Sequence, residues 1–180
     1  HYPVEFMTSI LNAESGDIER IAFLVTEAKK MDIEVFPPDI NKSAGIFSPD
    51  GKNIRFGLTA IKNVGENVVK AIIESRRSEG AFVDLTSFLS RINHRDLNKK
   101  SLEALIKCGA LDSFNERRLL LSNVEELLRY IKDLNKNINS SQIGLFESFS
   151  ALSPLNLKPS EPASKNEKLS WEKELLGLYT

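Results

Sequence analysis

The sequence predicts a mainly α-helical fold with a small β element and tandem helix-hairpin-helix units. Apolar residues recur every three or four positions through most of residues 59–138, which is the spacing of helices that bury one face. Short alternating runs rich in Ile, Val and Phe lie between residues 32 and 56, where they indicate strands. Near residue 60 a glycine turn separates two helical patterns. A small β element is therefore expected ahead of a helical region with hairpins.

Two helices are expected before residue 31. Tyr2-Pro3 places a proline at a helix start, where its missing N–H would have no helical partner. Ser15-Gly16-Asp17 is expected to cap the second helix. The apolar residues of the two helices are Phe6, Met7, Ile10 and Leu11, followed by Ile18, Ile21, Phe23, Leu24, Val25 and Ala28.

The β element is expected between residues 32 and 56. Residues 32–36 alternate like a short strand and are followed by Pro37-Pro38, which stops it. Ile46-Phe47 and residues 54–56 flank a segment rich in Pro, Asp, Gly and Asn. That composition favours a hairpin turn over residues 48–53.

Four helical segments are expected in residues 59–138. The first carries Val68, Val69, Ile72 and Ile73 and closes near Gly80. Asp84 and Asn98 are side chains that commonly cap helices, and the helix after Asn98 is expected to end at Gly109. The longest amphipathic run extends from Arg117 to about Ile138. Such apolar stripes are expected to form the core.

The charge distribution indicates where an anion could bind. The net charge is only −1, but residues 59–109 hold nine Lys/Arg against six Asp/Glu. Residues 1–58 hold six against nine, and residues 110–180 hold nine against ten. The middle third is therefore the place to expect phosphate contacts. A solvated helical surface is the alternative explanation.

Several classes of function are disfavoured by the composition. Cys108 is the single cysteine, which excludes an internal disulfide and fits a reducing, cytoplasmic setting. No stretch approaches the ~20 apolar residues of a membrane span, so no membrane partner is expected. Asp39, Asp50, Asp84 and Asp112 lie in separate predicted elements, without the spacing for two-metal phosphoryl transfer. We expect no catalytic residue, no metal site and no cofactor.

The sharpest motif is the turn in Ala60-Ile61-Lys62-Asn63-Val64-Gly65-Glu66, which precedes an apolar helix. Such a hairpin presents backbone N–H groups and a helix N-terminus to a phosphate. A glycine lets the phosphate approach closely, and asparagine tolerates the left-handed conformation. An ordinary αα-hairpin is the alternative. The candidate DNA-binding residues are Lys62, Asn63, Val64, Gly65, Glu66, Asn67 and Lys70.

A second, weaker copy is expected at residues 105–111, preceded by Asn98-Lys99-Lys100. It again has a helix, a glycine turn and a helix. Paired hairpins would contact both strands across a groove, whereas the alternative is a plain helix C-cap. The candidate DNA-binding residues of this copy are Lys107, Cys108, Gly109 and Ala110.

Residues 139–166 are rich in Ser, Asn and Pro, a composition that predicts a flexible linker. One apolar island, Gln142-Ile143-Gly144-Leu145-Phe146, interrupts this segment. Leu145 and Phe146 can anchor in a hydrophobic pocket while the Gln142 amide bonds at its rim. The alternative is a patch that folds back on the core. After the linker, a further helix is expected to begin near residue 167.

Several stretches carry a resemblance to a known family. They are His1-Tyr2-Pro3-Val4-Glu5-Phe6-Met7, Pro37-Pro38-Asp39-Ile40-Asn41, Ile54-Arg55-Phe56-Gly57-Leu58, Asn98-Lys99, Leu102-Glu103-Ala104-Leu105-Ile106-Lys107, Gly109-Ala110-Leu111-Asp112 and Glu174-Leu175-Leu176-Gly177-Leu178-Tyr179. Taken in order, the chain resembles the bacterial DNA polymerase III alpha subunits, which are C-family replicative polymerases. The start lacks an initiator Met, and we expect a piece of a longer protein.

The resemblance implies a domain organisation. Residues 1–30 would be the C-terminal end of the fingers domain, and residues 31–138 a duplex-binding domain with tandem helix-hairpin-helix turns and a small β hairpin. Residues 139–166 would be a flexible linker with a clamp-binding motif, and residues 167–180 would begin the next helix or domain. Gln142, Leu145 and Phe146 match the family's Gln and hydrophobic pair. Asn63 departs from the usual hairpin glycine.

The resemblance also implies partners and limits. The implied partners are duplex DNA, the sliding clamp (beta subunit) and other polymerase III holoenzyme subunits. The family's palm domain, with its catalytic aspartates and Mg²⁺, would lie upstream, so this piece is not expected to act as a DNA-directed DNA polymerase. The alternative is a structural scaffold whose hairpins pack on neighbouring polymerase domains.

Overall fold

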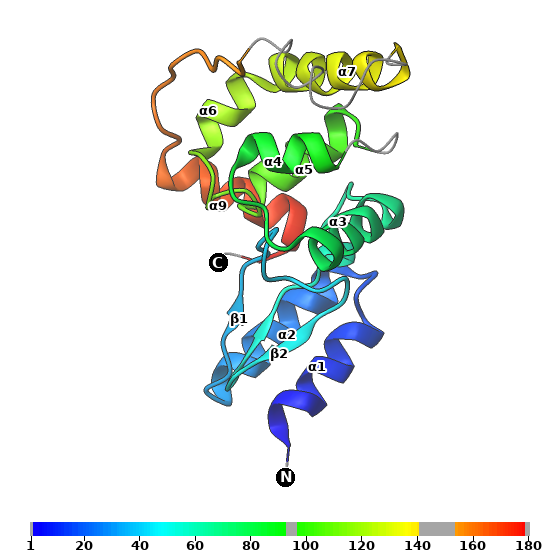
Figure 1. The fold of residues 1–180 in the computed structure, drawn as a ribbon. Coiled ribbons are helices and arrows are strands. Elements are labelled where there is room, and N and C mark those ends of the chain that lie inside the picture. Colours follow the sequence, from blue (N-terminus) through cyan, green and yellow to red (C-terminus); the bar gives the residue numbers. More distant parts are fainter. Residues whose placement is uncertain (1, 93–96, 141–153, 179–180) are drawn as a thin grey trace.

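The computed structural model describes residues 2–92, 97–140 and 154–178, with the backbone alone for residues 136–140. Helices α1 and α2 and the sheet form one end of the molecule, α7 lies at the other end, and α5 and α9 lie between them (Figure 1). Gln142, Leu145 and Phe146 lie outside the described residues. The predicted class, a mainly α fold with a small β element and helix-hairpin-helix units, is confirmed.

The first two helices begin where the sequence predicts. Helix α1 spans Pro3–Ala13 with its proline in the first turn, and α2 spans Ile18–Lys30. The Asp17 carboxylate accepts the amides of Glu19 and Arg20 at 2.9 and 3.0 Å. Phe6 and Phe23 differ from the predicted apolar faces, because 63% and 53% of their surfaces are exposed.

The β element is a three-stranded mixed sheet in the order β1-β3-β2. Strand β1 (Val35–Phe36) runs parallel to β3 (Asn53–Arg55), and β2 (Ser48–Asp50) runs antiparallel to β3. Asp50 pairs with Asn53, so the hairpin turn consists of residues 51 and 52 and is shorter than the predicted turn over residues 48–53. Gly51 has a φ of 64°, a conformation that glycine adopts without strain.

The remaining elements follow the expected order. They are the 3-10 turn Leu58–Ala60 (η1), α3 (Glu66–Glu79), α4 (Leu85–Arg91), α5 (Lys99–Lys107), α6 (Arg117–Ser122), α7 (Val124–Ser140) and α9 (Lys165–Leu176). Asp84 and Asn98 cap α4 and α5 as predicted. The predicted long helix from Arg117 is interrupted at Asn123, whose backbone leaves the helical conformation.

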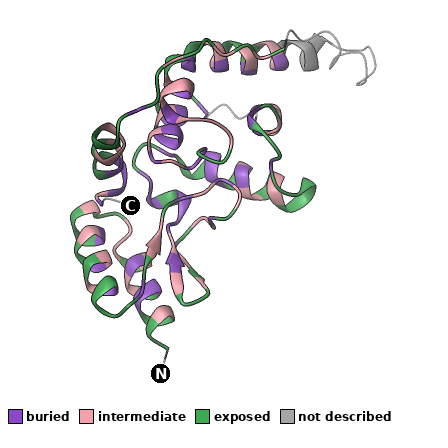
Figure 2. Cartoon of the chain, turned by 90° about the vertical axis from the view of Figure 1, so that its left-hand side faces the viewer, coloured by how far each residue is buried: buried purple, intermediate pink, exposed green. Residues whose placement is uncertain are grey.

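One hydrophobic core draws on helices and strands along the described chain (Figure 2). Leu11, Ile21, Ile54, Ile72 and Leu105 have no exposed surface. The first two helices therefore share a core with the sheet and with the hairpin region.

Residues 154–164, which fall within the predicted linker, contact the folded body. The Asn123 side chain bonds the Lys158 backbone in both directions, accepting at 2.8 Å and donating at 3.0 Å. The Ala163 amide donates to the Glu116 carboxylate at 3.1 Å. Ser164 and Glu167 then form a capping box that starts α9. None of the described helices is both long and apolar enough to cross a membrane.

Candidate nucleic-acid interface

The first hairpin is a tight turn between η1 and α3. Asn63 has a φ of 70°, in the left-handed region, which Asn adopts more readily than most other residues. The Val64 amide donates to the Ile61 carbonyl at 3.2 Å and closes the turn. Val64 is buried, while Lys62 and Asn63 are exposed. The turn is thus anchored by one apolar side chain and open to solvent on its polar side.

Gly65 is the N-terminal cap of α3, and neither its backbone conformation nor its packing requires a glycine there. Its φ of −75° and ψ of 153° suit any residue. A Cβ added there would meet nothing within 4 Å. The missing side chain therefore leaves bare backbone at the surface, where a ligand can approach the peptide groups closely.

The first turn of α3 offers unpaired amide donors. Within the described parts of the chain, the N–H groups of Gly65, Glu66 and Asn67 have no hydrogen-bond acceptor, and no side chain caps this helix. The positive end of the helix dipole adds to their donor strength. This arrangement is suited to an anion.

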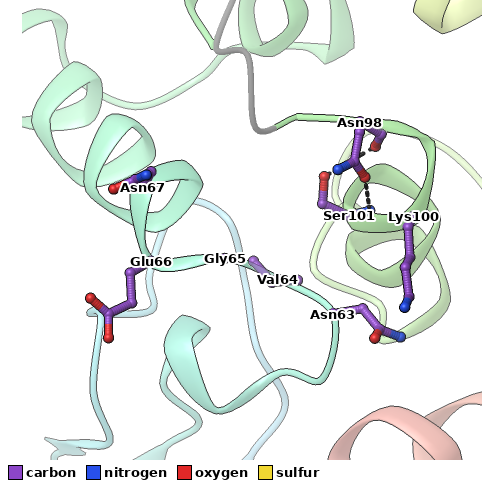
Figure 3. A pocket seen from close by; sticks show the side chains of 8 residues that line it. All are labelled: Asn63, Val64, Gly65, Glu66, Asn67, Asn98, Lys100 and Ser101. Carbon is purple, nitrogen blue, oxygen red and sulfur yellow. Dashed lines mark hydrogen bonds between the residues drawn. The ribbon is translucent and has the colours of Figure 1, made fainter.

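A hollow of about 600 Å³ lies between the first hairpin and the start of α5 (Figure 3). Asn98 caps α5 by accepting the Ser101 amide at 3.0 Å, and Lys100 in the same turn is exposed. The N-termini of α3 and α5 thus open onto the same hollow. Its lining comprises Asn63, Val64, Gly65, Glu66, Asn67, Asn98, Lys100 and Ser101.

The charges around this hollow have different partners. Lys70 lies 4.0 Å from Glu66 on the exposed face of α3. The Glu125 carboxylate bonds Lys99 at 2.6 Å and raises the pKa of that ammonium group. In the residues that the structure describes, Lys62 and Lys100 form no ion pair. Lys100 is therefore the unpaired cation at the lining of the hollow.

The turn after α5, where the sequence predicts a second copy, is built differently. Cys108, Gly109 and Ala110 donate their amides to carbonyls of α5 at 3.0–3.1 Å. A Cβ on Gly109, whose φ is 86°, would overlap the Arg117 guanidinium. Glycine is therefore required here by conformation and packing. Lys107 is half-buried, whereas Cys108 and Ala110 are buried.

Burial also makes Cys108 chemically inert. It raises the pKa of the thiol to about 12, so the group stays protonated near neutral pH. Among the predicted site residues, those of the first hairpin surround the hollow, whereas residues 107–110 use their amides inside the fold.

The part of the site that the sequence missed is the start of α5. Asn98, Lys100 and Ser101 line the hollow, although the sequence indicated Asn98 only as a helix cap and Asn98-Lys99-Lys100 only as the residues ahead of the second copy. Helix α5 packs against α6, α7 and α9, and this packing places its N-terminus beside the first hairpin (Figure 1). The local signal was the cap followed by two lysines. The proximity of two helix starts arises only in the folded chain.

The comparisons with known proteins agree with this geometry. Residues 32–121 match the family model described as the helix-hairpin-helix motif. The chain therefore belongs to the helix-hairpin-helix family.

Over 179 residues the chain is 40% identical to DNA polymerase III subunit alpha of Thermus aquaticus, covering 99% of this chain and 14% of the relative. It is 41% identical over 183 residues to DNA polymerase III subunit alpha of Deinococcus radiodurans, again covering 99% and 14%. For the subunit of Campylobacter jejuni the identity is 40% over 188 residues, covering 99% and 16%. The predicted resemblance to polymerase III alpha subunits is confirmed. The chain spans about one-seventh of the length of these relatives.

Proposed function

We propose that this chain is a non-catalytic part of a bacterial replicative DNA polymerase III alpha subunit and grips duplex DNA through backbone phosphates. The observation that carries the proposal is the hollow onto which the N-termini of α3 and α5 both open. Free amides, two helix dipoles and Lys100 are suited to phosphate oxygens. Because these groups bind the phosphates and not the edges of the bases, DNA binding is independent of the DNA sequence.

Within this proposal, the start of α5 is the second arm of the grip. Its first two amides, on Lys99 and Lys100, have no acceptor in the described residues. Residues 107–110 remain predicted contacts, but their amides already bond inside the fold. Two helix N-termini on one hollow would bind two phosphates and fix the direction of the DNA backbone between them.

The proposal extends to the sliding clamp and the domain organisation. Gln142, Leu145 and Phe146 are proposed to dock to the clamp as a short peptide, on the basis of their spacing. The boundaries near residues 30, 138 and 166, the cytoplasmic setting and the holoenzyme partners are proposals that rest on the resemblance. The polymerase activity of the parent is assigned to its palm domain. Incorporation of nucleotides by this chain alone would contradict that assignment.

Replacing Gly65 by valine should weaken duplex binding by roughly tenfold, since one hydrogen bond to a charged group contributes about 1.5–3 kcal/mol. The backbone angles of Gly65 suit valine and the space around it is open, so the fold should persist. Fluorescence anisotropy with several unrelated duplexes measures the loss, which should be equal for all of them.

Gly16→Val is the matched control, because a Cβ at Gly16 also meets nothing within 4 Å and this glycine lies between α1 and α2. It should bind DNA normally. Normal binding by Gly65→Val, or a loss confined to one sequence, would favour the scaffold interpretation in which the hairpins pack on neighbouring domains.

Lys100→Ala should lower the slope of log affinity against log salt concentration by about 0.9, the value for one lost phosphate contact on duplex DNA. Lys165→Ala removes the same charge from the exposed start of α9 and should leave the slope unchanged. Titrations at several salt concentrations compare the two variants. Equal slopes would exclude Lys100 from the grip.

A further inference from the structure

Helix α9 contacts the first hairpin directly. The Lys62 amide donates to the Leu175 carbonyl at 3.1 Å, immediately before the left-handed Asn63. The bonds at Ile61 and Val64 lie within the turn itself. The bond to Leu175 therefore ties the start of the hairpin to an element more than a hundred residues away in the sequence (Figure 1).

The same end of α9 also contacts the N-terminal helices. Gly177 ends α9 with a φ of 77°, and a Cβ there would lie 2.6 Å from the Ile18 carbonyl oxygen of α2. Leu175, Leu176 and Leu178 are buried. Close backbone contact and apolar burial therefore fix the end of α9 between α2 and the hairpin.

A buried ion pair holds the middle of α9. Glu172 accepts from Arg117 at 2.7 Å, and their side chains are only 5% and 8% exposed. Arg117 also bonds Asp112 and the Lys107 carbonyl. Burial acts to lower the pKa of Arg117, but its bonds to the two carboxylates outweigh that effect and raise the pKa above its ordinary value. Removing one partner of such a pair leaves an inadequately compensated buried charge.

We propose that α9 positions the DNA-gripping hairpin, with Glu172 as a positioning residue that acts through the Leu175–Lys62 bond. This inference rests on the proposed function. When α9 is docked, the peptide before Asn63 is fixed and the amides at Gly65 and Glu66 face the hollow in one orientation. When α9 is loosened, those amides sample other orientations and the phosphate grip weakens. The DNA affinity of the hairpin thus depends on a helix that does not line the hollow.

The test compares Glu172→Ala with Glu174→Ala. Both variants remove one carboxylate from α9, but Glu174 is exposed and pairs with no described residue. Duplex affinity is measured by anisotropy at a temperature where both variants are folded, and hydrogen exchange is measured at the Lys62 amide. Glu172→Ala should bind DNA at least about fivefold more weakly, at the low end of typical couplings between sites, and exchange faster at Lys62. Glu174→Ala should change neither quantity.

A purely structural role for Glu172 is distinguished from a positioning role by combining Glu172→Ala with Gly65→Val. If both changes affect one phosphate contact, the double variant should bind no more weakly than Gly65→Val alone. Additive losses would overturn the positioning role. If Glu172→Ala fails to fold, Glu172→Gln, which keeps an acceptor for Arg117 but loses the charge, is measured in the same way with Glu174→Gln as its control.

The remaining outcomes distinguish the two proposals. Faster exchange at Lys62 with unchanged DNA affinity, while Gly65→Val still weakens binding, would overturn the positioning role and leave the DNA grip intact. Unchanged exchange and unchanged affinity in the Glu172 variants would also overturn it. If Gly65→Val itself binds normally, the DNA grip fails, and the positioning role fails with it.

Discussion

Replacing both Leu145 and Phe146 by alanine is expected to reduce the affinity for the sliding clamp by two orders of magnitude or more. We propose these two side chains as the apolar anchors of the Gln142–Phe146 peptide. Full burial of one such side chain contributes about 1.5–3 kcal/mol, and about 1.4 kcal/mol corresponds to a tenfold change in affinity. Ordering the peptide opposes part of this gain, so the intact motif should bind in the micromolar range, on the order of −8 kcal/mol.

Titration against the cognate clamp measures this effect. Phe149→Ala, which removes an aromatic ring three residues beyond the motif, is the control and should bind the clamp normally. The double variant should also keep its DNA affinity, because the hollow lies at α3 and α5. Unaltered clamp affinity would mean that the island is a packing patch.

Gly57→Ala should produce the largest loss of folding stability among alanine substitutions at the described glycines that lie outside the left-handed region (Gly16, Gly45, Gly57 and Gly65). A Cβ at Gly57 would overlap the backbone of Ile46 and lie 2.5 Å from the Phe47 nitrogen. Backbone bonds from Leu58 to Ala44 (3.0 Å) and from Thr59 to Gly45 (2.8 Å) hold the two segments together. Overpacking of this kind destabilises by about 1–3 kcal/mol or more, and a backbone obstacle cannot rotate away as a side chain can.

Urea denaturation of Gly57→Ala and Gly65→Ala provides a matched comparison. Both substitutions restrict the unfolded chain equally, and both glycines have φ values near −80° and −75°. Only the first creates a clash in the described structure. Equal midpoints for the two variants would show that the Gly57 region can move apart, and the close approach would then not stabilise the fold.

Local signals allowed most of the secondary structure to be predicted from sequence. Asp17, Asp84 and Asn98 each cap the helix that follows, because a cap depends on residues only two or three positions away. The interruption at Asn123 was not predicted. Its side chain bonds to Lys158, 35 residues along the chain, and a contact at that separation leaves no periodic signal.

The candidate site was only partly predictable for a related reason. Gly65 and Gly109 stand in similar helix–glycine–helix patterns, yet a Cβ would be free at the first and would overlap Arg117 at the second. The sequence does not contain that distinction, because it depends on which side chain packs over the turn. Asn98 and Lys100 were noted only ahead of the second copy, since their place beside the first hairpin depends on the packing of α5 against α6, α7 and α9.

If Gln142–Phe146 docks to a clamp as proposed, the way α7 is fixed at its start limits how far that clamp can lie from DNA. The 17 residues of α7 form a rod about 25 Å long, which packs on the core through Val124, Leu127 and Ile131. Phe146 follows the last residue of the rod by six positions, a reach of at most about 20 Å whatever path the chain takes. Further along the chain, the Lys158 backbone bonds to the Asn123 side chain, which lies beside the start of α7. A clamp that binds this peptide is therefore connected to the core through a helix and a short segment, not through a long flexible linker. The distance of that clamp from the hollow is then limited by about 25 Å of α7 and at most about 20 Å of further chain.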